Sequence, residues 1–209
     1  MKKYCSAIFW GICFIIFTVL VKFVDVQPVG AEASLIGFAN LNTAVFQLLG
    51  TNDFCYRLTQ CLGIVAIATA ARYAIDGFIQ LIKRKSLFKV DREILMVGII
   101  YAIVIILYVL FEKLAINYRP IITDEGLEAS YPSTHTMLIL TVFGTAIPLA
   151  GKYIKNPKAA TLEKICLIIF MWVTVVCRLL SGVHWFTDII GGLLISLALI
   201  SLYKALRNK

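Results

Sequence analysis

The chain has 209 residues, of which 60% are hydrophobic and only 15% are charged, with a net charge of +8 and a mean hydropathy of +0.88. Soluble domains carry about 45–50% apolar and about 25% charged residues, so this composition excludes an ordinary soluble domain. In so apolar a chain, excess Lys and Arg indicates membrane topology and contact with anionic lipid rather than nucleic-acid binding. One membrane span needs about 20 apolar residues, which leaves room for about six spans and no sizeable soluble domain.

Six apolar segments predict six membrane-spanning helices in an all-α bundle that forms one membrane-embedded domain, residues 1–209. They cover residues 4–23, 58–82, 94–111, 134–150, 165–180 and 189–206. The first is too long for a signal peptide and lacks a cleavage site, so we expect it to be retained. The second contains Arg72 and Asp76, whose spacing favours a local structural ion pair over a functional site.

Residues 31–49, between the first two spans, carry apolar side chains at a roughly helical period. Two interpretations are equally open at this point. The segment forms an interfacial helix on the membrane surface, or it forms a loop packed over the mouth of the bundle.

The basic residues predict the orientation of the chain. If the N-terminus is cytoplasmic, 14 of the 20 Lys and Arg residues lie on the inner side. By the positive-inside rule both termini then face the cytoplasm, and the loops after the first, third and fifth spans face outward. The outer segments hold five basic residues, Lys22, Arg57, Lys113, Arg119 and Arg178.

Three of these outer cations and both histidines of the chain flank helix ends on the same side of the membrane. The set consists of Lys113 and Arg119 after the third span, Pro132, Ser133, Thr134 and His135 at the start of the fourth, and Arg178, His184 and Asp188 between the fifth and sixth. A small bundle must place these ends close together. We therefore expect the residues to form one site.

The chemistry of this set favours a phosphate ligand. Fixed cations for which the sequence indicates no acidic partner suit an oxyanion, and Ser133 can cap a helix whose free N–H groups attract anions. His184 and Asp188 are four residues apart, so the carboxylate can hold one ring nitrogen while the other attacks. His135 is then available to protonate a leaving group.

These motifs resemble the signature of the type 2 phosphatidic acid phosphatase family. That signature is Lys, six residues and Arg-Pro, then Pro-Ser-any-His, then Ser-Arg, five residues, His, three residues and Asp. Here it reads as Lys113 with Arg119-Pro120, then Pro132 to His135, then Arg178, His184 and Asp188. The resemblance covers essentially the whole chain, and it implies six helices with an outward-facing site.

The resemblance also implies the role of each residue. His184 attacks phosphorus to form a phosphohistidine, Asp188 orients it and His135 protonates the leaving group. The phosphate oxygens are held by Lys113, Arg119, Ser133, Arg178 and the backbone N–H of Thr134. The family requires no metal, and the sequence indicates no other cofactor.

The chain departs from the family signature at three positions. Five residues separate Lys113 from Arg119 where the signature has six, which turns Lys113 by about 100° around its helix. Cys177 replaces the serine before Arg178, and Thr134 stands where glycine is common. We expect these changes to tune the site, because both histidines, both arginines and the aspartate remain.

The sequence thus predicts a multi-pass cell-membrane phosphatase whose partners are the bilayer and a lipid phosphate. Candidate substrates are polyprenyl pyrophosphate, phosphatidylglycerol phosphate and phosphatidic acid. Two alternatives stay open, a phosphotransferase using the same histidine and a non-catalytic protein that binds or transports anionic lipid. The oligomeric state is open as well.

Overall fold

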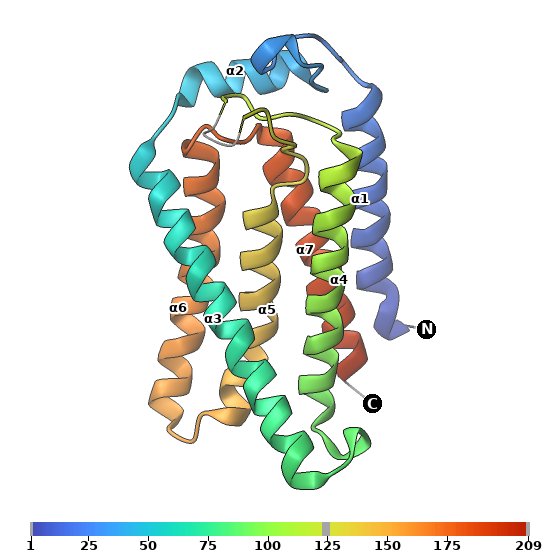
Figure 1. Cartoon of the computed structure of the whole chain (residues 1–209), viewed down its shortest axis with the longest axis vertical. Coiled ribbons are helices and arrows are strands. Elements are labelled where there is room, and N and C mark those ends of the chain that lie inside the picture. Colours follow the sequence, from blue (N-terminus) through green and yellow to red (C-terminus); the bar gives the residue numbers. More distant parts are fainter. Residues whose placement is uncertain (1, 123–125, 208–209) are drawn as a thin grey trace.

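The computed structural model describes residues 2–122 and 126–207 as a bundle of six long helices with a shorter helix across one end (Figure 1). The long helices are α1 (Cys5–Phe23), α3 (Asp53–Arg84), α4 (Arg92–Leu114), α5 (Thr134–Tyr153), α6 (Pro157–Leu180) and α7 (Phe186–Arg207), and the short one is α2 (Ala39–Leu49). Each long helix is long and apolar enough to cross a membrane. The predicted six-span, all-α fold is confirmed.

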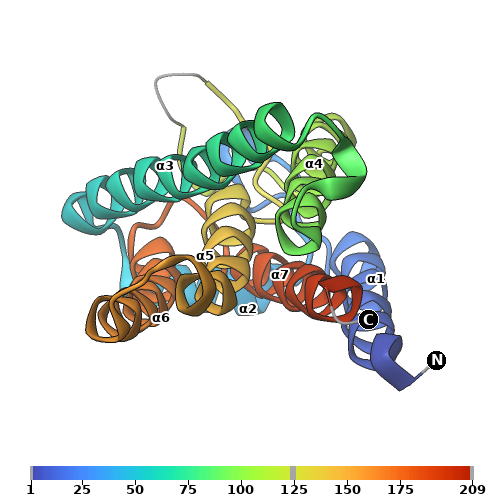
Figure 2. The same ribbon diagram turned by 90° about the horizontal axis from the view of Figure 1, so that it is seen from below.

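Helix α5 lies at the centre of the bundle, and Figure 2 shows α3, α4, α6 and α7 around it. Most of its side chains are buried, whereas α1 packs along α7 at the periphery and leaves much of its apolar surface exposed. In a bilayer such exposed apolar surface faces lipid. The central helix is therefore enclosed by other helices along most of its length.

Each of the two interpretations of residues 31–49 is correct in part, as helix α2 shows. It is a helix, and it also lies over one end of the bundle (Figure 1). The Asn42 side chain is fully buried and donates a hydrogen bond to the hydroxyl of Thr187 in α7. The backbone N–H of Thr187 donates back to Asn42 Oδ1, so the pair fixes α2 to the start of α7.

The start of α1 and the end of α7 lie at the end of the bundle opposite α2 (Figure 1). The basic turn between α3 and α4 and the turn between α5 and α6 lie at that same end. The segments rich in Lys and Arg are therefore separated from the α2 end by the length of the helices.

Two helices begin earlier than predicted because polar residues cap them. Asn52 Oδ1 accepts from the N–H of Cys55 at the start of α3, and Asn156 Oδ1 accepts from the N–H groups of Lys158 and Ala159 at the start of α6. Such caps satisfy backbone donors that have no partner inside the helix. Hydropathy alone misses these polar first turns.

The early start of α6 changes the partner of Arg72. Glu163 falls within α6, and its Oε1 lies 3.1 Å from Nη1 of Arg72 in α3. The expected local pair of Arg72 with Asp76 is thus wrong in its partner, because placing the start of the span at residue 165 left Glu163 outside the helix. The ion pair is structural, as expected, and it connects two helices.

Candidate active site

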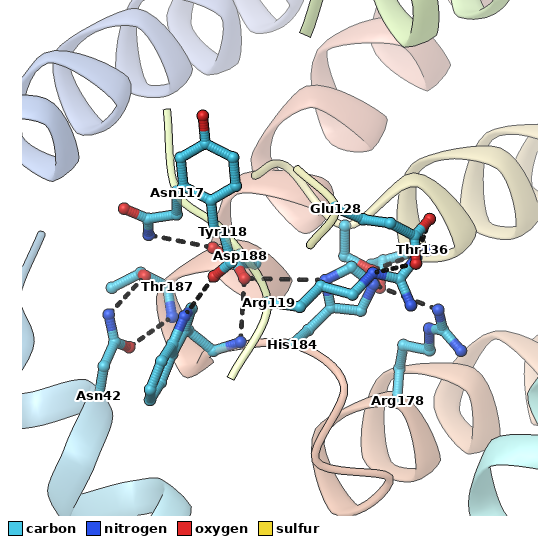
Figure 3. A network of polar contacts seen from close by, with 12 residues as sticks. Asn42, Asn117, Tyr118, Arg119, Glu128, Thr136, Arg178, His184, Thr187 and Asp188 are labelled. Carbon is cyan, nitrogen blue, oxygen red and sulfur yellow. Dashed lines mark hydrogen bonds and ion pairs between the residues drawn. The ribbon is translucent and has the colours of Figure 1, made fainter. Parts of the chain in front are cut away.

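Residues from the three motifs, Lys113 excepted, lie together at the α2 end of the bundle, with His184 between Asp188 and Arg178 (Figure 3). His184 lies in the loop between α6 and α7 and is only 3% exposed. Its Nε2 is 3.2 Å from Nη2 of Arg178. A guanidinium can only donate, so Nε2 accepts and carries the lone pair, and the ring proton sits on Nδ1.

The electrostatic surroundings keep His184 uncharged. Burial lowers the pKa of His184 well below its ordinary value, and the nearby Arg178 and Arg119 guanidinium groups lower it further. A neutral imidazole with its lone pair on Nε2 is the nucleophilic form.

Asp188 faces the other ring nitrogen of His184, with Oδ2 3.7 Å from Nδ1. The same oxygen accepts from the backbone N–H of Trp185 at 2.9 Å, and Oδ1 accepts from Nδ2 of Asn117 at 3.2 Å. The first bond is half of a capping box, because Asp188 is the third residue of α7 and Trp185 precedes the helix. Asp188 therefore has two roles: it caps the start of α7 and it faces the His184 imidazole.

Two buried asparagines that sequence reasoning missed hold this arrangement. Asn117 receives the N–H of Gly37 on its Oδ1 at 3.1 Å while it donates to Asp188. Asn42 binds Thr187, the residue before Asp188. Asn117 lies between Lys113 and Arg119 of the first motif, and this position was the only signal for it in the sequence. Asn42 carries no motif signal, because its role depends on a contact with a distant helix.

Arg178 lies in the last turn of α6 and is fully buried. Its Nη1 donates to Oγ1 of Thr59 at 3.2 Å, and its guanidinium lies over the ring of Tyr56 at 5.7 Å. Within the described residues its Nε has no hydrogen-bond acceptor. Such a buried donor beside the lone pair of His184 marks a place for an anion.

The start of α5 supplies the second motif. Ser133 Oγ caps the helix by accepting from the N–H of Thr136, and the Ser133 N–H donates to the backbone oxygen of Asp188 at 3.0 Å. The predicted cap is confirmed. Thr134 is the first residue of the helix, and the Nε2 of His135 is hydrogen-bonded to Oε1 of Gln60 in α3.

Residues 94–209, more than half of the chain, match the family model of the PAP2 superfamily, and all three motifs fall inside this match. The chain belongs to this superfamily. Among solved structures, it is similar to the first transmembrane PAP2-type phosphatidylglycerolphosphate phosphatase, from Bacillus subtilis. That match has 16% identity and a TM-score of 0.66, covers 95% of this chain and 94% of the other, and shows a shared fold. No curated protein matches the sequence.

As a PAP2 superfamily member with six apolar helices, the protein is a membrane phosphatase.

Arg119, from the first PAP2 motif, departs from the expectation of cations without acidic partners. Its Nε lies 3.3 Å from Oε2 of Glu128, and its backbone N–H donates to the Glu128 backbone oxygen. The sequence reasoning overlooked Glu128 because it comes nine positions after Arg119 in the chain. Glu128 is thus a counter-ion that a phosphate would have to displace or share.

Lys113 of this PAP2 chain stands apart from the other motif residues. It lies in the last turn of α4 with its side chain exposed, and no contact joins it to the site within the described residues. Its role in binding phosphate stays a prediction.

Two cavities border the PAP2 site on the side of α3. An apolar groove of about 350 Å³ between α3, α4 and α5 is lined by Ile64, Ile67, Ile105, Tyr108, Gln60 and His135, among others. A more polar cavity of about 300 Å³ is lined by residues that include Thr51, Tyr56 and Ser181. Gln60 lines the groove and Tyr56 lines the polar cavity, and their side chains are hydrogen-bonded to each other.

Proposed function

We propose that this PAP2 protein is a metal-independent lipid phosphatase that works through a phosphohistidine on His184. The observation that carries the proposal is the position of the His184 lone pair. Nε2 is uncharged and directed at the buried Arg178, while a lipid-facing groove ends at the second histidine, His135. This arrangement supports His184 as the nucleophile, Arg178 as an anion ligand and His135 as the acid for the leaving group.

In the first step, His184 Nε2 attacks phosphorus and the bond from phosphorus to the lipid oxygen breaks. His135 gives its proton to that oxygen, so the lipid leaves as an alcohol or a shorter phosphate. Asp188 stabilises the charge that develops on the His184 ring. Arg178, Arg119 and Lys113 hold the phosphate oxygens together with Ser133 and the N–H of Thr134, a contribution that grows as charge spreads in the transition state.

In the second step, water attacks the phosphorus of phosphohistidine. His135 accepts a proton from the water, the bond between phosphorus and Nε2 breaks, and inorganic phosphate leaves. His184 returns to its neutral form and His135 to its protonated form. Each histidine therefore ends the cycle in its starting state.

The donor set supports a mechanism without metal. Both oxygens of Asp188 already accept hydrogen bonds, from Trp185 and Asn117, and the adjoining groups are guanidinium cations. Divalent cations prefer free carboxylate oxygens in a negative environment. We expect EDTA to leave the rate unchanged.

The groove supports a lipid as the leaving group. Its walls are almost entirely apolar, and Ile64, Ile67 and Ile105 are more than half exposed on the membrane-facing surface. The structural neighbour is a phosphatidylglycerolphosphate phosphatase, so phosphatidylglycerol phosphate is the first substrate to test, followed by polyprenyl pyrophosphate and phosphatidic acid.

We propose an extracytoplasmic site and cytoplasmic termini. The basic turns lie at the end of the bundle opposite α2 and the site, as the positive-inside rule requires for that orientation. Labelling of single cysteines in intact cells with a membrane-impermeant maleimide tests it. Label entering at residue 57 but not at residue 85 supports this orientation, and the reverse pattern contradicts it.

The test of activity compares wild type with His184→Ala on the three lipid phosphates, with vanadate as inhibitor. We expect vanadate-sensitive phosphate release by wild type and at least a 1,000-fold loss in the variant. Arg57→Ala is the control, because Arg57 is an exposed outer cation paired with Asp53. No release by wild type would overturn the hydrolase, full release by the variant would overturn the role of His184, and a phosphorylated lipid acceptor seen by mass spectrometry would indicate a transferase.

A further inference from the structure

Helix α3 contributes no residue to the three motifs, yet one of its faces forms a wall of the site. Tyr56, Thr59 and Gln60 are spaced so that they share a face of the helix. Thr59 and Tyr56 contact the Arg178 guanidinium, and Gln60 contacts His135. This face therefore contacts both the anion site and the second histidine.

The His135 ring is held by α3 at two points. Its Nε2 is hydrogen-bonded to Gln60 Oε1, and its edge packs against Gly63, where an added Cβ would lie 3.4 Å from the ring. The Gln60 amide is itself held, because its Nε2 donates to the Tyr56 hydroxyl at 2.9 Å. The amide is thereby oriented with its oxygen toward His135.

We propose that Gln60 is a positioning residue that fixes the tautomer of His135, so that Nδ1 is the nitrogen that exchanges protons during the reaction. A carbonyl oxygen can only accept, so Nε2 keeps its hydrogen in both protonation states of the ring. This inference rests on the proposed function, in which His135 is the acid and then the base.

The proton balance follows from this tautomer. In the first step, the Nδ1 proton passes to the lipid oxygen as its bond to phosphorus breaks. In the second step, Nδ1 takes a proton from the attacking water. The Nε2 hydrogen stays on its bond to Gln60 throughout, and the ring cannot turn to present the wrong nitrogen.

The test uses Gln60→Leu, which removes the acceptor, and Gln60→Glu, which keeps an acceptor at the same position. The control is Gln80→Leu, on the same helix at the opposite end of the bundle, where Gln80 binds Asp91. The kinetic readout is kcat/KM, which covers the steps up to breakage of the phosphate ester. It is measured on a lipid phosphate and on p-nitrophenyl phosphate, whose leaving group departs without a proton.

We expect Gln60→Leu to lower kcat/KM about 10- to 100-fold on the lipid phosphate, since a general acid contributes about 100- to 10,000-fold. The loss on p-nitrophenyl phosphate should be less than about 3-fold, because no proton is needed there. Gln60→Glu should restore most of the rate, and Gln80→Leu should match wild type. If the role of Gln60 were purely structural, Gln60→Leu would lower kcat/KM on both substrates equally.

The second readout is ¹⁵N NMR of histidine-labelled protein, in which the chain gives signals from only two histidines. Neutral His135 should show its proton on Nε2 in wild type and in Gln60→Glu, and a mixture of tautomers in Gln60→Leu, with His184 unchanged. Equal losses on both substrates, or an Nδ1-protonated His135 in wild type, would overturn the inference. If wild type releases no phosphate from any substrate, the proposed function fails and the inference fails with it.

Discussion

The two histidines of the site have very different surroundings. His184 lies in a buried loop between Asp188 and Arg178 (Figure 3). Asn117 and Asn42 hold Asp188 and its neighbour Thr187. His135 lies in the first turn of α5, is hydrogen-bonded through its side chain to Gln60, and borders an apolar groove. The first environment is polar and closed, and the second is open toward lipid.

This difference matches the two tasks that we propose. A nucleophile reacts faster when it is held in one orientation, with no proton on the attacking nitrogen and little contact with water. An acid for the leaving group must instead meet the oxygen of an incoming lipid, so it belongs where the groove ends. If the tasks are divided in this way, changes in the two regions should have separable effects.

The largest effect should come from Asp188→Asn. The amide removes the negative charge that stabilises the His184 ring, and we expect kcat/KM to fall about 1,000-fold or more. Asp91→Asn is the control, because Asp91 holds Arg84 at the opposite end of the bundle. A fall below about 10-fold, with unchanged thermal stability, would show that Asp188 only begins α7.

Filling the groove should give a smaller effect, confined to substrates with long chains. Ile64→Trp places a large ring in the groove, and we expect KM for a long-chain lipid phosphate to rise about 10-fold. A water-soluble, short-chain phosphate should be hydrolysed as before. Ile75→Trp, on an exposed face of α3 outside the groove, is the matched control. Equal effects on both substrates would contradict a chain-binding role.

Removing the counter-ion of Arg119 should strengthen phosphate binding slightly. Glu128→Gln frees the guanidinium from its ion pair, so we expect inhibition by inorganic phosphate to become about 2- to 5-fold tighter. Glu112→Gln, which changes an exposed acid at the end of α4, should have no effect. Weaker inhibition in Glu128→Gln would mean that Glu128 positions Arg119 for phosphate.

The smallest perturbation is a titration of the unmodified protein. Because the pKa of His184 is lowered, its NMR signal should stay that of a neutral ring as the pH falls through about 6.5, the ordinary value for histidine. His135→Asn assigns the signals. In this pH range the unfolded chain gains a proton that folded His184 does not, so His184 makes the fold less stable as the pH falls toward its lowered pKa. A His184 signal that titrates near pH 6.5 would contradict the lowered pKa and the buried environment that causes it.

The fold could be predicted because hydropathy determines which segments cross a membrane. The missed parts were polar first turns of helices, as in α6, which Asn156 caps and which contains Glu163. Capping and interhelical pairing operate there, and a count of apolar residues does not detect them.

The motif residues of the site were also predictable, since their spacing lies within short stretches of chain. The residues that hold them were not. Asn42 and Gln60 act through contacts with α7 and α5, which no local pattern encodes. A faint signal was present in α3, where Tyr56, Thr59 and Gln60 place polar groups on one face of the helix near its start.

Gln60 lines an apolar groove and Tyr56 lines a polar cavity, and this arrangement has a consequence for the direction of the proposed reaction. In the proposed reaction, cleavage of a lipid phosphate yields one lipid-soluble product and one water-soluble product. The alcohol can diffuse away in the bilayer while the phosphate is diluted into the surrounding water. Once apart, the two products rarely meet again at the same protein molecule, so separation into two phases helps to keep the reaction running forward.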